Sequence, residues 1–383
     1  MLAGIFYLSK IQHQFVKLVF NVIPPLLFCY FLPSLLVENG LIIIGDTDLN
    51  ATLSKTLLPF CIFYFTLGLP ISKLKAIGRK PIILFSVGAL GIVLGGPISL
   101  IISHYLFPEA FNAESYKGMA TIAGSWIGGT ANQMALNAIF LPNTDELAKA
   151  VTVDVFFGET WLAILLFLIP FQQKINQFLR ASYDQHAVSM HWEDDLSVKK
   201  FTFNHLIYIL GLGFIITAIC LNLGNRIAEL IGISFLNPSF WTFLLCTLFG
   251  IGLGISSLRK LYSEGGDVIA TLFLYFIIAS IGLKISLSHL FSTPLLLFTG
   301  FIWISIHGLT IFVVGKWIKA PYHYMAIASQ ANVGGIASTS VIATAFSPIL
   351  APLGVILALL GYAIGTYGGY LSAILMQWVS QTY

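Results

Sequence analysis

Apolar segments about as long as a lipid bilayer is thick follow one another along almost the whole chain. A helix needs about 20 apolar residues to cross roughly 30 Å of hydrocarbon. Nine segments of about this length are 15–37, 54–70, 81–107, 148–171, 203–223, 239–256, 267–284, 294–317 and 352–378. Charged residues make up only 9% of the sequence, against about 25% in soluble domains. The sequence therefore predicts an all-α polytopic membrane protein whose main partner is the lipid bilayer.

Two further apolar segments, 117–141 and 322–346, each contain two adjacent glycines near the middle. Two glycines in a helix interior cost about 2 kcal/mol relative to two alanines, so we expect both helices to break there. Each arm then has about ten residues, or roughly 15 Å of helix, which reaches only the bilayer midplane. We therefore predict nine transmembrane helices and two re-entrant hairpins. The alternative, in which both segments span, gives eleven helices.

The charges of the loops favour the hairpins. Segment 71–80 carries four basic residues and no acid, which places it in the cytoplasm, whereas 38–52 carries three acids and no base and suits the outside. If both glycine-rich segments spanned the membrane, the basic loops 257–267 and 316–323 would fall outside. With two hairpins they fall inside. The prediction places the N-terminus in the cytoplasm and the C-terminus outside.

The two halves of the chain resemble each other in register. Subtracting 206 pairs identical residues of the two glycine-rich segments, namely Tyr322, Met325, Ala326, Gly334, Gly335 and Ala337 with Tyr116, Met119, Ala120, Gly128, Gly129 and Ala131. An offset of 214 likewise pairs residues of 272–286 with residues of 58–72. Because loop 71–80 is predicted inside and its counterpart 285–293 outside, the repeats are inverted.

Four parts of the chain follow from this repeat. The first membrane repeat covers 1–171 and the second covers 239–383, each with one hairpin. The helix 203–223 connects them and supplies the odd crossing that inversion requires. The polar segment 172–202 is interpreted as a solvated cytoplasmic linker, since its basic and acidic residues balance.

Polar residues surround both glycine pairs. At each break one short helix ends and another begins, and the new helix offers N–H groups and a partial positive charge to an anion. The candidate substrate-binding residues are Ser125, Gly128, Gly129, Thr130, Asn132, Gln133, Gln330, Asn332, Gly334, Gly335, Ser338 and Thr339. The alternative is that the glycines form packing faces and the hydroxyls bond to their own helices.

Two acids, Asp154 and Glu159, lie inside the apolar segment 148–171. Ionisable groups within a membrane are costly and mark functional sites, so both are candidates for coupling to Na⁺ or H⁺. The alternative for Asp154 is a solvated position near the outer end of the helix. His307, alone in its segment, is predicted to be a hydrogen-bonded core histidine.

Signatures of other functions are absent from the sequence. It shows no nucleophile–base pair, phosphate-binding loop or clustered metal ligands, so we expect neither an enzyme nor a bound metal or organic cofactor. The net charge of +3 and the absence of a basic run give no reason to expect a nucleic-acid partner.

Three motifs, GSWIGGTAN at 124–132, ANVGG at 331–335 and LGYAIGTYGG at 360–369, resemble the YjcL-like family of bacterial membrane proteins. That family is classed as a domain of unknown function, and the resemblance implies a location in the bacterial inner membrane. The paired glycine-rich hairpins are also similar, more distantly, to the sodium-coupled glutamate and citrate symporters. In those proteins re-entrant tips form the substrate site and one domain moves as an elevator.

These observations predict an ion-coupled secondary transporter of a small, anionic organic solute, with alternating access of the elevator type. A homodimer is expected, because elevator transporters commonly need a fixed partner. One alternative is a cation/proton antiporter in which the intramembrane acids are the whole mechanism. Another, from a different class, is a membrane scaffold or sensor that transports nothing.

Overall fold

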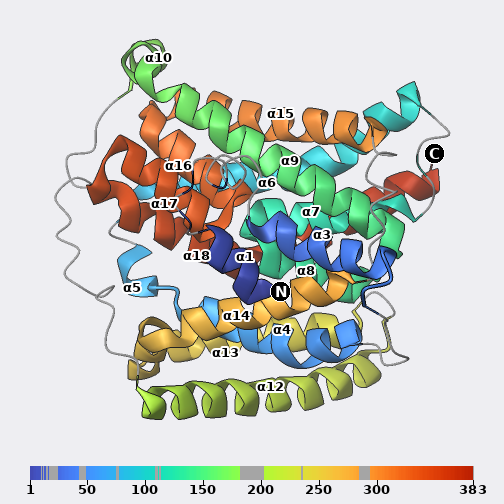
Figure 1. The fold of residues 1–383 in the computed structure, drawn as a ribbon. Helices are drawn as coiled ribbons and strands as arrows, with labels where there is room; N and C mark the ends of the chain where they lie inside the picture. Colours follow the sequence, from blue (N-terminus) through green and yellow to red (C-terminus); the bar gives the residue numbers. More distant parts are fainter. Residues whose placement is uncertain are drawn as a thin grey trace.

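The computed structural model describes residues 1–9, 25–42, 49–74, 77–107, 114–181, 202–233, 236–283 and 294–382, together with residues 11, 13, 16 and 111. Within these ranges all regular secondary structure is helical (Figure 1). The first half contains α1 (Leu2–Ser9), α3 (Pro25–Glu38), α4 (Leu49–Leu67), α5 (Ile71–Leu74), α6 (Arg79–Leu106), α7 (Ser115–Gly128), α8 (Thr130–Phe140), α9 (Thr144–Phe167), η2 (Ile169–Phe171) and α10 (Gln172–Leu179). The second half contains α12 (Phe203–Ile231), α13 (Pro238–Gly254), η3 (Ser257–Arg259), the π-helical turn η4 (Tyr262–Gly266), α14 (Asp267–Gly282), α15 (Pro294–Trp317), α16 (Tyr322–Val333), α17 (Gly335–Phe346), η6 (Pro348–Leu350) and α18 (Ala351–Thr382).

Six helical segments of the described chain are long and apolar enough to cross a membrane. They are Arg79–Leu106, Thr144–Leu179, Phe203–Ile231, Ser257–Gly282, Pro294–Trp317 and Ala351–Thr382. Two other predicted spans coincide with the shorter apolar helices Thr52–Leu67 and Pro238–Gly254. The predicted class, an all-α multi-pass membrane protein, is confirmed.

Both glycine pairs interrupt a helix. Gly129 separates α7 from α8 and has φ 83°, and Gly335 opens α17 with φ 69°. A Cβ atom built on Gly124 would lie 2.5 Å from Cδ1 of Leu136. In a straight helix twelve residues would separate these positions by about 18 Å. The chain therefore turns back at Gly129, and α7 and α8 form a helical hairpin.

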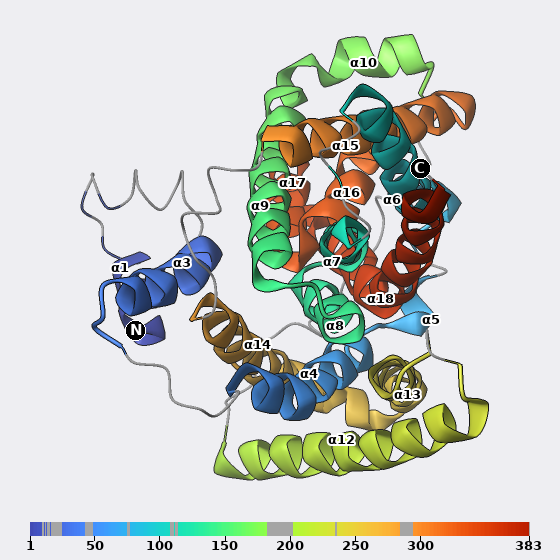
Figure 2. The same cartoon turned by 90° about the vertical axis from the view of Figure 1, so that its right-hand side faces the viewer.

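The helices fall into two groups, which Figure 2 shows one above the other. The hairpin group contains α6, α7, α9, α15, α16, α17 and α18, in which α7 packs on α18 and α15 packs on α6. The wall group contains α4, α12, α13 and α14, in which α4 contacts the other three. Helix α8 contacts both groups, since it packs on α7 and α18 as well as on α4 and α13. The first hairpin therefore reaches from one group to the other.

Small residues bring α7 and α18 into backbone contact. A Cβ atom on Gly361 would lie 2.7 Å from the carbonyl oxygen of Ile127, and one on Gly365 would lie 2.8 Å from Cα of Gly128. One turn further on, a Cβ atom on Gly369 would lie 2.8 Å from the backbone nitrogen of Gly124. Glycines at every fourth position let two apolar helices pack this closely in a membrane. This stripe holds the first helix break against α18.

The same order of helices occurs in the two halves. Helices α4, α6, α7, α8 and α9 are followed later by α14, α15, α16, α17 and α18. The pairs Ser115–Phe140 and Tyr322–Phe346 cover nearly the same residues as the predicted hairpins 117–141 and 322–346. The loop 285–293, which decides the predicted inversion, lies outside the described residues.

The predicted linker 172–202 begins as a packed helix. Its first residues form α10, and the backbone N–H of Tyr322 donates a hydrogen bond of 2.8 Å to Oδ1 of Asn176. This contact ties the start of the linker to the first residue of α16. Residues 182–201 of the linker lie outside the described residues.

Candidate functional site

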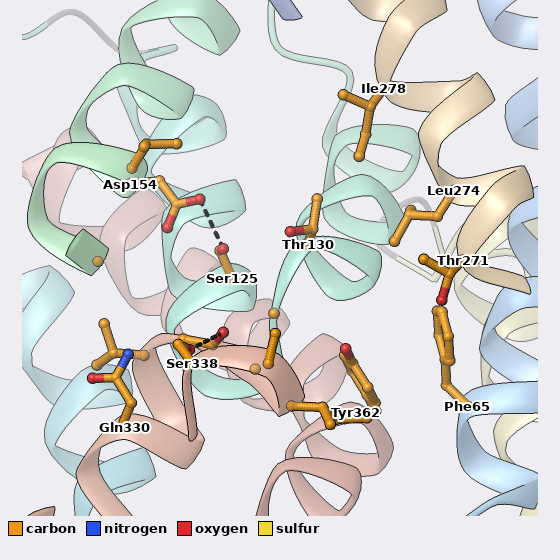
Figure 3. Close-up of a pocket in the computed structure, with 18 of the residues that line it drawn as sticks. Phe65, Ser125, Thr130, Asp154, Thr271, Leu274, Ile278, Gln330, Ser338 and Tyr362 are labelled. Atoms are coloured by element: carbon orange, nitrogen blue, oxygen red, sulfur yellow. Dashed lines mark hydrogen bonds between the residues drawn. The ribbon is translucent and has the colours of Figure 1, made fainter. Parts of the chain in front are cut away.

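A cavity of about 510 Å³ lies where the two helix breaks face the wall group. Figure 3 shows Asp154, Ser125, Gln330 and Ser338 on the side of the hairpin group. The opposite side is formed by Phe65 of α4 and by the α14 residues Thr271, Leu274 and Ile278 (Figure 3). The cavity therefore lies between the two groups of helices.

Asp154 joins α9 to both arms of the first hairpin. Its side chain is 7% exposed. The hydroxyl of Ser125 on α7 donates to Oδ2 of Asp154 at 2.8 Å, and Nε2 of Gln133 on α8 donates to the same oxygen at 3.1 Å. The solvated alternative for Asp154 is therefore wrong. Any change in the charge of this carboxylate acts on both arms at once.

The two helix breaks meet at the cavity. A Cβ atom built on Gly129 would lie 3.8 Å from Cα of Gly335, and 3.1 Å from Cε1 of Tyr362. A Cβ atom on Gly335 would lie 3.6 Å from the Tyr362 hydroxyl oxygen. The N-termini of α8 and α17 therefore open onto the same space, with the Tyr362 ring beside them. The first N–H groups of each helix have no partner within that helix.

Gln330 is a buried amide that lines the cavity. It is 0% exposed, and within the described part of the chain neither Oε1 nor Nε2 has a hydrogen-bond partner. Leaving a buried polar group unpaired costs about 1–3 kcal/mol. The Gln330 amide therefore has one donor group and one acceptor group to offer at the cavity.

Most of the predicted site residues line this cavity. They are Ser125, Gly129, Thr130, Asp154, Glu159, Gln330, Gly334, Gly335 and Ser338. The predicted residues that do not line it are Gly128, Asn132, Gln133, Asn332 and Thr339.

The predicted residues outside the cavity have other contacts. Nδ2 of Asn132 donates to the carbonyl of Gly128 at 2.7 Å, and the Thr366 hydroxyl donates to Oδ1 of Asn132 at 2.6 Å. The Thr339 hydroxyl bonds back to the carbonyl of Gly335, as the packing alternative expects. Asn332 is buried beside Gly88 of α6, and neither of its amide atoms has a partner within the described residues.

Several cavity residues were not identified from the sequence. They are Phe65, Val155, Gly158, Tyr262, Asp267, Thr271, Leu274, Tyr275, Ile278, Val333, Ile336, Ala337 and Tyr362. Asp267 has a signal that could have been used, because it is an acid at the first position of a long apolar helix. The apolar wall residues have no such signal, since residues of this kind occur throughout the spans.

The family model described as "Protein of unknown function (DUF819)" matches residues 1–379. The chain belongs to the DUF819 family. No curated protein matches the sequence. The match agrees with the predicted membership in a family of unknown function, while the YjcL-like designation and the relation to the sodium-coupled symporters stay predictions.

The charge of the cavity in this DUF819 protein is one-sided. Asp154 and Glu159 on α9 and Asp267 on α14 line it, and no Lys or Arg is among the described lining residues. Asp154 is buried, Asp267 is half-buried and Glu159 is exposed. Within the described ranges, no three His, Cys, Asp or Glu side chains cluster closely enough to hold a metal ion.

A hydrogen-bonded chain behind the cavity fixes four helices of the hairpin group. Nδ1 of His307 on α15 lies 2.9 Å from the Gly88 carbonyl of α6, and Nε2 lies 2.9 Å from the hydroxyl of Ser329 on α16. Nε1–H of Trp161 on α9 donates to the same hydroxyl at 2.8 Å. His307 is fully buried, so the predicted hydrogen-bonded core histidine is confirmed. Ser329 is the immediate neighbour of Gln330, so these hydrogen bonds help to position the Gln330 amide at the cavity.

Proposed function

We propose that this protein is an ion-coupled secondary transporter of a small organic solute. The observation that carries the proposal is the meeting of two helix breaks, one from each half of the chain, at a cavity lined by carboxylates. Broken helices that pair across two repeats occur in many secondary transporters, where they form the binding site near the bilayer midplane. Irregular backbone at that depth persists only where protein or a cavity satisfies it.

The size of the cavity supports a solute as well as an ion. At about 510 Å³ it falls within the range of pockets that hold small molecules. A site that served a single bare cation would need no space of this size. A membrane scaffold or sensor would not need two helix breaks that meet at a cavity.

Asp154 is the proposed coupling residue. It receives one hydrogen bond from each arm of the first hairpin, so binding of Na⁺ or H⁺ at its carboxylate would redirect both Ser125 and Gln133. Within a membrane, neutralising such a charge lowers the cost of moving the site. Ion binding and rearrangement of the hairpin are thereby linked.

The proposed motion is a displacement of the hairpin group along the wall group, as in an elevator. The α4 and α14 side of the cavity is mostly apolar, with Phe65, Leu274 and Ile278 facing it (Figure 3). Apolar side chains form few directional bonds that would hold the hairpin group in one position. We propose further that the protein lies in the bacterial inner membrane with its N-terminus in the cytoplasm, and that it is a homodimer with a fixed wall group.

The alternative transport function is a cation/proton antiporter without an organic solute. It is favoured by one observation, namely three acids and no base among the described residues that line the cavity. Such a protein would exchange Na⁺ for H⁺ with no solute present.

Reconstitution of the purified full chain into vesicles tests both functions. An inward Na⁺ or H⁺ gradient is imposed, and uptake of labelled amino acids and carboxylates is followed. The proposal expects uptake that stops when an ionophore removes the gradient. Exchange of Na⁺ for H⁺ without solute uptake would establish the antiporter instead, and vesicles with neither flux would contradict transport.

A further inference from the structure

Two kinds of chemistry line the cavity. The first is carboxylate: Asp154 and Glu159 of α9 in the hairpin group and Asp267 of α14 in the wall group line it, and no basic side chain is among the described lining residues. The second is the N-termini of α8 and α17, helices of 11 and 12 residues. Three acids repel a solute that carries only negative charge, and two helix N-termini disfavour a solute that carries only positive charge.

The carboxylates of Glu159 and Asp154 differ in the number of hydrogen bonds that they accept from the protein. Asp154 is buried and holds two hydrogen bonds from the first hairpin. Glu159 is exposed, and no hydrogen bond or ion pair to it is found within the described residues. The carboxylate of Glu159 is therefore available to a cationic group of the solute, while Asp154 serves the coupling ion.

Gln330 supplies an independent sign of a ligand near the start of α17. Its amide is 0% exposed, lines the cavity and lacks partners for both Oε1 and Nε2 within the described chain. It lies on α16, four residues before Gly334, and α17 begins at the next residue, Gly335. A carboxylate at the N-terminus of α17 would accept hydrogen bonds from Nε2 of Gln330 and from the first N–H groups of the helix.

We propose that the solute is a zwitterion of the amino-acid type, with its ammonium group at Glu159 and its carboxylate at Gln330 and the helix N-termini. A ligand without a carboxylate leaves the buried amide of Gln330 unpaired, and a ligand without an ammonium group forgoes the attraction of Glu159. This inference rests on the proposed transport function. It refines the expectation of an anionic solute, because it keeps the carboxylate and adds the ammonium group.

The test uses matched ligands that differ only in charge. Leucine, 4-methylpentanoate and 3-methylbutylamine share one side chain and carry both charges, the carboxylate alone and the amine alone; alanine and glutamate with their matched analogues extend the series. Titration calorimetry on the purified full chain, with and without Na⁺ and at two pH values, measures binding. The inference expects at least one amino acid to bind about tenfold or more tightly than either of its analogues.

Two variants assign the ends of the solute. Glu159→Gln should weaken amino-acid binding about tenfold and leave the matched carboxylate unaffected, while Glu229→Gln on exposed α12 should change neither. Gln330→Ala should weaken the binding of ligands that carry a carboxylate, with Gln177→Ala on α10 as its control.

Equal binding of an amino acid and a singly charged analogue would overturn the inference, as would binding of none of the series. Gradient-driven flux in vesicles decides the transport function separately from either result.

Discussion

Gly129 and Gly335, which lie 206 positions apart in the chain, lie close together where the two helix breaks meet. A Cβ atom on Gly129 would lie 3.8 Å from Cα of Gly335, and the two residues have φ values of 83° and 69°. The separation of 206 is the offset that relates the two glycine-rich segments. Equivalent points of the two halves therefore meet at one site.

Valine at either glycine should abolish transport while leaving insertion into the membrane intact. A β-branched residue at a positive φ is strained by about 1–2 kcal/mol or more, and at Gly129 its side chain would also press on Tyr362. Transport assays on Gly129→Val and Gly335→Val, with expression and melting temperature alongside, check this. Gly211→Val on α12, where an added Cβ meets no atom within 4 Å, is the control. Normal transport by both site variants would rule out the proposed binding site.

Asp154→Asn should remove the dependence of transport on the coupling ion. The asparagine keeps an oxygen that accepts from Ser125 and Gln133 but loses the charge that holds Na⁺ or H⁺. Initial rates of uptake across a range of Na⁺ concentrations and pH values should become flat. Asp145→Asn on the first turn of the same helix weakens a partly exposed ion pair with Lys149, does not line the cavity and should keep the wild-type profile. An unchanged profile in Asp154→Asn would show that the carboxylate is structural.

Gly365→Ala should destabilise the protein by about 1–3 kcal/mol. The added methyl group would lie 2.8 Å from Cα of Gly128, and neither backbone can move without separating α7 from α18. Thermal unfolding in detergent measures the effect. Gly368→Ala on the same helix is the matched comparison, because its methyl group meets the end of the flexible Ile127 side chain and should cost less. Equal melting temperatures for the two variants would argue against the backbone contact.

Ser329→Ala should lower the melting temperature and weaken solute binding together. Removal of the hydroxyl leaves the Trp161 N–H and Nε2 of His307 without their partner, at about 1–3 kcal/mol. Because Ser329 directly precedes Gln330, the loss of these hydrogen bonds should also make the position of the Gln330 amide in the cavity less fixed. Ser305→Ala on α15 removes only a bond to the carbonyl of Phe301 in its own helix and should be near neutral. A variant with the melting temperature of the wild type would show that the hydrogen bonds through Ser329 do not stabilise the hairpin group.

The sequence predicted the membrane class and the two glycine breaks because each has a local physical cause. Apolar length fixes the spans, and paired glycines fix where α7 and α16 end. The sequence could not show in the same way which of several neighbouring polar residues line the cavity. Gln330 and Asn332 are two positions apart and point to different sides of α16, so only Gln330 lines the cavity.

The wall of the cavity depends on contacts between distant helices. Phe65 and Leu274 come from α4 and α14, which face the hairpin group only after the whole chain has folded. Both lie in largely apolar segments, so no local pattern separates a wall residue from one that faces lipid. The burial of Asp154 also depends on contacts between helices, since Ser125 and Gln133 donate hydrogen bonds to it from two other helices.

The most direct test of the central claim, that the cavity binds a solute together with a coupling ion, is thermal stability of the purified protein. The melting temperature is measured with carboxylates, amines, amino acids and short peptides, each with and without Na⁺ and at two pH values. A ligand that binds only the folded state raises the melting temperature by mass action. The account predicts a rise with an amino acid or peptide that grows with Na⁺ or with lower pH and is lost in Asp154→Asn. A rise with Na⁺ or pH alone, and none with any solute, would contradict it.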